Sequence, residues 1–153
     1  MSHARLHPVR FPPTRLEEKV TIALARIVLK SVHQAEQVLK PLGLTPTQYN
    51  ALRIINGAGP DGVCGTEIGK RLITTVPDVT RLLDRLEYGG LIVRERDSVN
   101  RRFVTAHITV EGQKRLSEAV PLVSELHKGR FKGLDTSQLQ TLLELAQSVQ
   151  DGN

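Results

Sequence analysis

Two arginines and a threonine at helical spacing could make contacts with duplex DNA. Val79, Leu82, Leu83 and Leu86 fall on one face of a predicted helix. At about 100° per residue, the other face carries Pro77, Thr80, Arg81, Asp84 and Arg85. A hydroxyl near a helix N-terminus suits a phosphate, and a guanidinium fork suits the guanine edge in the major groove. The alternative is a solvated helix face with ordinary charge pairing.

A basic hairpin directly after this helix favours the DNA interpretation. The stretch contains Glu95 and Asp97 together with four arginines, Arg94, Arg96, Arg101 and Arg102. Alternating β-branched segments on either side, Leu91 to Arg96 and Phe103 to Ile108, predict a two-stranded hairpin. An arginine at such a tip suits the minor groove, where the potential of DNA is most negative.

The elements before this pair are helical. Apolar residues at spacings of three and four from Leu16 to Leu39 predict one long helix that ends before Pro41. Thr45, Pro46 and Gln48 predict the start of a second helix through a capping box. A short third helix is expected from about Thr66 to Leu72. For the fourth helix, Thr75 to Asp78 indicates a second capping box with Thr75 as the N-cap.

The region after the hairpin is predicted to form two more helices. Thr109 caps the first, with Leu116, Val120, Val123 and Leu126 expected to face inward. Pro121 lies inside this helix and is expected to kink or split it. Asp135 with Gln138 opens the last helix. The outer helices carry more apolar surface than a monomer with a small central core would cover, so we expect them to pair with a second copy.

Composition limits the class of protein. The 153 residues have a net charge of +5, which makes a polyanion the first partner to consider, and only 3% are aromatic, which disfavours stacking on single strands. The single cysteine, Cys64, excludes an internal disulfide and indicates a reducing compartment, so we expect a cytoplasmic protein. No apolar run is long enough for a membrane span. His3 and His7 have metal-ligand spacing but no third ligand nearby, so no metal or cofactor is expected.

The segment from Leu44 to Leu116 resembles the MarR family of bacterial transcriptional regulators. The resemblance lies in the string VTRLLDRLE, in Gly90-Leu91, in Asp97-x-x-Asn100-Arg101-Arg102 and in Thr109-x-x-Gly112. It implies a homodimer formed by the outer helices, binding to a palindromic operator, and release by a small amphipathic or phenolic ligand or by an oxidant. The resemblance therefore implies a ligand-responsive repressor.

The resemblance also assigns DNA-binding positions. Those of the recognition helix are Thr75, Pro77, Asp78, Thr80, Arg81 and Arg85; those of the wing are Arg94, Arg96, Asp97, Asn100, Arg101 and Arg102. At position 100 the family usually has Asp, so here Asn100 would brace Arg102 without charge assistance. The resemblance does not assign the effector-binding residues.

The expected fold is therefore mainly α with a small β-hairpin: a winged helix-turn-helix core flanked by dimerisation helices. We expect an extended arm over residues 1–14, the DNA-binding domain over 44–109, and dimerisation helices over 15–43 and 110–153. An alternative function is a winged-helix interaction module whose basic wing faces an acidic protein. An enzyme is not expected, because no spacing suggests a nucleophile–base pair, paired carboxylates or a metal cluster, and no catalytic residue is assigned.

Overall fold

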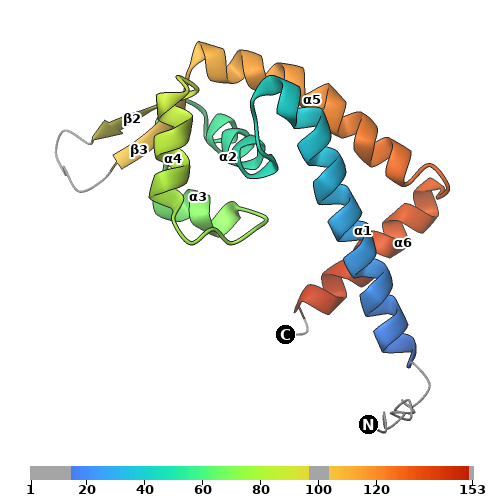
Figure 1. Ribbon diagram of the computed structural model, residues 1–153. Coiled ribbons are helices and arrows are strands. Elements are labelled where there is room, and N and C mark those ends of the chain that lie inside the picture. Colours follow the sequence, from blue (N-terminus) through green and yellow to red (C-terminus); the bar gives the residue numbers. More distant parts are fainter. Residues whose placement is uncertain (1–14, 97–103, 152–153) are drawn as a thin grey trace, which may run out of the picture. The chain divides into compact units, whose positions relative to one another are not determined.

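The computed structural model describes residues 15–96 and 104–151 (Figure 1). The chain divides after His33 into two units, residues 1–33 and 34–153, and each is described by itself. In the first unit the described part is the N-terminal portion of helix α1 (Leu16–Leu39). Its large apolar side chains are exposed in the single chain: Leu16, Val20, Ile22, Leu24, Ile27, Val28, Leu29 and Val32.

The second unit contains the end of α1 and all the elements that follow. In chain order these are η1 (Lys40–Leu42), α2 (Pro46–Gly57), η2 (Gly59–Asp61), β1 (Val63–Cys64), α3 (Gly65–Arg71), α4 (Val79–Tyr88), β2 (Ile92–Arg96), β3 (Val104–Ile108), α5 (Val110–Arg130) and α6 (Thr136–Asp151). Figure 1 shows α2, α3, α4 and the strands gathered together, with α5 following β3.

Local capping signals start three of the helices as predicted. The Gln48 amide donates to Thr45 Oγ1 at 3.1 Å, and the Thr45 amide donates to Gln48 Oε1 at 2.9 Å, which is a complete capping box for α2. Asp135 and Gln138 make the same reciprocal pair before α6. Thr109 accepts from the Gly112 amide at the start of α5. These bonds satisfy amide groups that would otherwise have no partner within the helix.

The prediction of Thr75 as the N-cap of α4 is wrong. The helix begins at Val79, and Asp78 is the N-cap, with its Oδ1 accepting from the Arg81 amide at 2.9 Å. Val76 precedes Pro77, and a residue before proline is disfavoured in the helical conformation, so the helix cannot start at that point. Thr75, Pro77 and Asp78 therefore precede the helix.

Across residues 15–96 and 104–151 the sheet has three strands, one more than predicted. The order is β1-β3-β2 and both pairings are antiparallel, with Val63 opposite Ala106 in one and Arg94 opposite Ala106 in the other. β1 is only two residues long, too short for an alternating pattern to be recognised. The loop between β2 and β3, which the sequence predicts as a basic tip, lies outside the described residues.

One apolar core joins these elements. Its largest fully buried side chains come from α1, α2, α3, α4 and β2: Leu39, Leu52, Ile55, Ile68, Leu86 and Ile92. No polar or charged residue is buried among the described residues. Three helices packed on a small antiparallel sheet form a winged helix-turn-helix, so the predicted fold class is confirmed.

One expectation about α5 is wrong, and one of the two alternatives for Pro121 is excluded. Ala119 is buried where Val120 was expected, and Val120 is 44% exposed, because the inward face follows Gly112, Leu116, Ala119 and Val123. Pro121 does not split the helix, which is continuous through it. Both Pro121 and Ser117, whose carbonyl loses its usual donor, are exposed, so water can satisfy that carbonyl.

From residue 136 to residue 150, α6 has no buried residue in the single chain. Leu142, Leu143, Leu145 and Val149 are all at least 38% exposed. Of the helices in the described ranges, none combines the length and the apolar character that a bilayer crossing requires.

Candidate nucleic-acid interface

Helix α4 presents a polar face opposite its buried one. Leu83 and Leu86 are buried, and Val79 and Leu82 are partly buried against the core. Thr80, Arg81, Asp84 and Arg85 are exposed on the other side. The sequence predicted this division of faces, and the structure confirms it.

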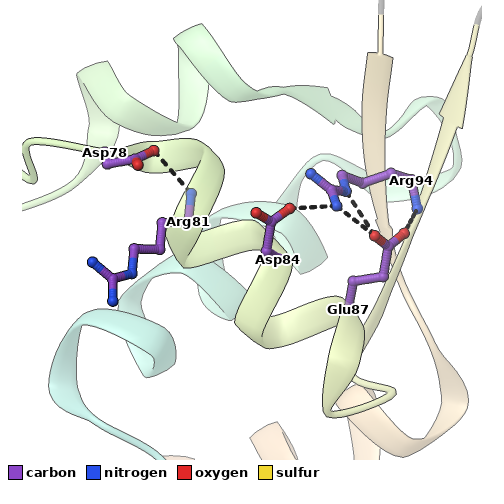
Figure 2. Close-up of polar contacts among 5 residues, drawn as sticks. All are labelled: Asp78, Arg81, Asp84, Glu87 and Arg94. Carbon is purple, nitrogen blue, oxygen red and sulfur yellow. Dashed lines mark hydrogen bonds and ion pairs between the residues drawn. The ribbon is translucent and has the colours of Figure 1, made fainter.

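Both acidic residues near the arginines of α4 are already engaged. Asp78 accepts the Arg81 backbone amide as the helix cap, and Asp84 Oδ1 lies 2.6 Å from Arg94 Nη2. Among the described residues, no carboxylate pairs with the guanidinium of Arg81 or of Arg85. In Figure 2 the Arg81 side chain extends away from the cluster around Arg94. Two cationic groups with several hydrogen-bond donors therefore remain for an anionic partner.

The start of α2 lies beside these arginines. A shallow cavity of about 420 Å³ lies between the two helix starts, and its lining includes Thr45, Thr47, Gln48, Arg81 and Arg85. The first residues of α2 thus share one concave surface with the arginines of α4. Sequence reasoning used Thr45 and Gln48 only as helix caps and missed this location. The cavity depends on how two helices pack, and no local pattern reports that.

The loop before α4 is held by a residue that the sequence analysis also missed. Asn50 Oδ1, from α2, accepts the Ile73 amide at 3.1 Å. The Ile73 side chain is 85% exposed, and Thr75 and Pro77 are exposed as well. This bond joins residues 23 positions apart and attaches the loop to α2 two residues before the predicted position Thr75.

Arg94 lies on β2 but is bonded to α4. Its Nε and Nη2 donate to Glu87 Oε2 at 2.9 and 2.6 Å, and its backbone amide donates to Glu87 Oε1 at 2.9 Å (Figure 2). The hydrogen bond with Arg94 lowers the pKa of the Glu87 carboxyl and, reciprocally, raises the pKa of Arg94. The Arg94 side chain is only 25% exposed. Its charge is therefore already partnered within the protein.

The remaining wing positions divide into two groups. Arg96 is exposed at the end of β2, opposite Val104 of β3. Asp97, Asn100, Arg101 and Arg102 lie outside the described residues. Of the predicted wing positions, only Arg94 and Arg96 are thus given a location.

Cys64 lies at the junction of β1 and α3. Its Sγ is 3.2 Å from Thr66 Oγ1, and this hydrogen bond is the main cause that lowers the pKa of the thiol. Both residues line a cavity of about 690 Å³ beside α4 that also includes Val79, Thr80 and Leu83. In the described ranges, no three side chains of His, Cys, Asp or Glu gather closely enough to hold a metal ion.

Comparison with known proteins agrees with this geometry. A family model described as the MarR family matches residues 42–102. The chain is 32% identical over 106 residues to YkoM of Bacillus subtilis (strain 168), described as an uncharacterized HTH-type transcriptional regulator; the match covers 69% of this chain and 68% of YkoM. The identity and coverage identify a helix-turn-helix transcriptional regulator. The chain belongs to the MarR family.

Solved structures show the same fold. A mutant of MarR from E. coli, crystallised with operator DNA, has a TM-score of 0.77 and 25% identity, covering 89% of this chain and 99% of that one. BpsR of Bordetella bronchiseptica, whose DNA binding is regulated by 6-hydroxynicotinic acid, has a TM-score of 0.80 and 22% identity, covering 93% of this chain and 100% of that one.

Proposed function

We propose that this chain is a cytoplasmic, ligand-responsive repressor that binds a palindromic operator in duplex DNA as a homodimer. It works by binding and not by catalysis. The observation that carries the proposal is the exposed face of α4, where Arg81 and Arg85 pair with no described carboxylate and the nearby acids are engaged elsewhere. Membership of a family of transcriptional regulators supports it.

The residues have distinct proposed roles. Thr80, Arg81 and Arg85 face the major groove, where arginine donates to guanine O6 and N7. Thr75, Pro77 and Asp78 lie at the entry to the recognition helix, with Asp78 acting as its cap. Arg96, Asp97, Asn100, Arg101 and Arg102 belong to the wing, whose arginines reach the flanking minor groove.

The start of α2 adds phosphate contacts to this set. Thr45, Thr47 and Gln48 line the same cavity as Arg81 and Arg85. Hydroxyl and amide side chains donate to phosphate oxygens, and most contacts to duplex DNA go to its backbone. Residues 44–109 therefore form the proposed DNA-binding domain.

The proposed dimer uses the outer helices, residues 15–43 and 110–153. The apolar side chains of α1 and of α6 that are exposed in the single chain supply a surface for a second copy. A two-fold axis places two recognition helices in successive major grooves, about ten base pairs apart, which calls for a palindromic site. The effector is proposed to be a small amphipathic acid, by analogy with the compound that regulates BpsR.

The proposal is tested with purified protein and DNA from upstream of its own gene. Titration at low and moderate salt should show a complex of one dimer per site that survives excess nonspecific DNA. The loss of charge in Arg81→Ala should weaken it, whereas Lys132→Ala, which removes a charge on the α5–α6 connection, should not. Wild-type protein that is monomeric and ignores duplex DNA in dilute buffer would contradict the proposal. A screen of phenolic and other small acids for release of bound DNA then tests the effector class.

A further inference from the structure

The contacts of Arg94 set it apart from Arg81 and Arg85. Its guanidinium donates to Glu87 and to Asp84, both on α4, at distances of 2.6 to 2.9 Å (Figure 2). Two carboxylates surround one guanidinium, so this cluster has no positive charge left for DNA. With two carboxylates against one guanidinium, the three groups carry a net negative charge, so a phosphate gains no net attraction from Arg94 while both ion pairs are intact.

Glu87 also caps the free edge of the wing. In the order β1-β3-β2, no strand from the described part of the chain lies on the outer side of β2. The Arg94 amide points to that side and donates to Glu87 Oε1 at 2.9 Å. One carboxylate therefore holds both the backbone and the side chain of Arg94, and through them ties the strand to the recognition helix. Without Glu87, the Arg94 amide would be an unpaired donor at the edge of the sheet.

The pair between Asp84 and Arg94 also changes the charge of the exposed face of α4. This carboxylate lies on the exposed face of α4, between Arg81 and Arg85 in sequence. Without a cationic partner, the Asp84 carboxylate would face the DNA phosphates and repel them. The Arg94 guanidinium, 2.6 Å away, offsets its charge.

We infer that Arg94 is a positioning residue: through Glu87 it fixes the wing against the recognition helix, and it offsets the charge of Asp84, without contacting DNA itself. This inference rests on the proposed function. It reassigns one of the wing positions that the family resemblance marks as DNA-binding, and it adds Glu87 to the residues on which DNA binding depends.

A charge-matched pair of variants tests the inference. Glu87→Gln and Asp84→Asn each remove one negative charge from α4 and one ion pair from Arg94. Simple electrostatics predicts that both tighten DNA binding. We expect Asp84→Asn to tighten operator binding about twofold or more, because it removes a negative charge beside the phosphates and leaves the Arg94–Glu87 pair intact. We expect Glu87→Gln to weaken operator binding at least about fivefold, because Arg94 loses the ion pair that attaches the wing to α4. If Glu87→Gln tightens operator binding as Asp84→Asn does, the inference is overturned.

Substitution of Arg94 supplies an independent readout. Lysine keeps the charge but not the fork that bonds two carboxylates. A positioning role predicts that Arg94→Lys binds as weakly as Arg94→Gln, with the wild-type salt slope retained in both. A phosphate contact predicts the opposite: Arg94→Lys near wild type, and a slope in Arg94→Gln shallower by about 0.9. That second pattern would overturn the inference even if Glu87→Gln fails to fold.

Failure of the proposed function has its own signature. Wild-type protein without operator binding would overturn the proposed function, and with it the inference. Wild-type binding together with matching behaviour of Glu87→Gln and Asp84→Asn would overturn the inference alone. Amide hydrogen exchange in the DNA-free protein measures the anchor directly: the Arg94 amide should exchange at least about tenfold faster in Glu87→Ala, which removes its acceptor, than in Asp84→Asn. Equal exchange in both variants would likewise overturn it.

Discussion

Gly112, in the first turn of α5, packs directly against the carbonyl group of Leu91, at the start of the wing. A Cβ at position 112 would overlap the Leu91 carbonyl oxygen and would stand 2.8 Å from Ile108 Cγ1. Thr109 joins the same contact, since its amide donates to Leu91 O at 3.1 Å and its hydroxyl to Gly90 O at 2.7 Å. Two motifs that are distant in the sequence, Gly90-Leu91 and Thr109-x-x-Gly112, thus meet at one junction between α4, the wing and α5.

Gly112→Ala should destabilise the protein, because the added methyl group meets backbone that cannot move without shifting the wing. We expect a loss of about 1–3 kcal/mol in the free energy of unfolding, measured by denaturant titration. The matched control is Gly129→Ala in the same helix, where nothing lies within 4 Å of the new methyl group. Since alanine is the better helix former by up to about 1 kcal/mol, this control should be neutral or stabilising. Equal effects of the two would contradict the crowded junction.

Asp78→Ala should destabilise α4, whereas Thr75→Ala should not. Asp78 accepts the Arg81 amide, and loss of an N-cap costs about 0.5–2 kcal/mol. Thr75 is exposed and precedes the helix, so its replacement should stay within about 0.5 kcal/mol. Thermal and denaturant unfolding without DNA keep this test separate from any role in binding. A larger loss in Thr75→Ala would restore Thr75 as the cap.

The contribution of Glu87 to stability should disappear in acid. The bond with Arg94 lowers the pKa of Glu87 in the folded protein, so the unfolded chain takes up the proton first as pH falls. The stabilisation is fully present well above the unfolded value, about 4.3, and is lost as pH falls through the folded pKa. For this partly exposed pair we expect about 1 kcal/mol or less between wild type and Glu87→Gln at pH 7, and a smaller difference near pH 3.5. A difference that grows on acidification would show that the sign is wrong.

Arg81→Ala should weaken the discrimination between operator and unrelated duplex. A guanidinium that reads a base edge contributes about 1–3 kcal/mol of discrimination, and its loss relaxes specificity at that base pair. Arg102→Ala, in the wing, should instead weaken all duplexes alike and make the salt slope shallower by about one unit. Competition titrations with single base-pair changes separate the two. If Arg81→Ala weakens binding to all duplexes equally, Arg81 contacts a phosphate and not a base edge.

Val120→Glu should shift the protein towards monomer. Val120 is 44% exposed on α5, one residue from the buried Ala119, and a carboxylate there would be buried if a second copy covers the outer helices. Sedimentation equilibrium should show a weaker dimer by at least about tenfold, a change of about 1.4 kcal/mol. Lys70→Glu, an exposed change on α3 in the DNA-binding domain, is the control and should leave the dimer intact. An unchanged dimer in Val120→Glu would move the interface off this face of α5.

Sequence reasoning worked where the stabilising contact is local. The reciprocal bonds of Thr45 with Gln48 and of Asp135 with Gln138 span three residues, and the buried face of α4 repeats every three or four. Such contacts form within a single turn of helix, so residue type and spacing are enough to predict them. The fold class and the outward position of Arg81 and Arg85 followed from these signals.

Other features required the assembled structure. Strand β1 forms because Val63 pairs with Ala106 of β3, which is distant in the sequence. Helix α5 buries Ala119 instead of Val120 because its partner surfaces fix the rotation of the helix, which a period of three or four leaves open.

By itself the sequence determined which segments are helices, where most of them begin, and which arginines face outward from α4. Only the tertiary structure decided which arginines of α4 and the wing pair with a described carboxylate. Arg94 and Arg81 are alike as residues in a basic stretch, and they differ because folding brings Glu87 and Asp84 to one and not to the other. Charge pairing between elements depends on distances in space, and residue order alone does not encode them.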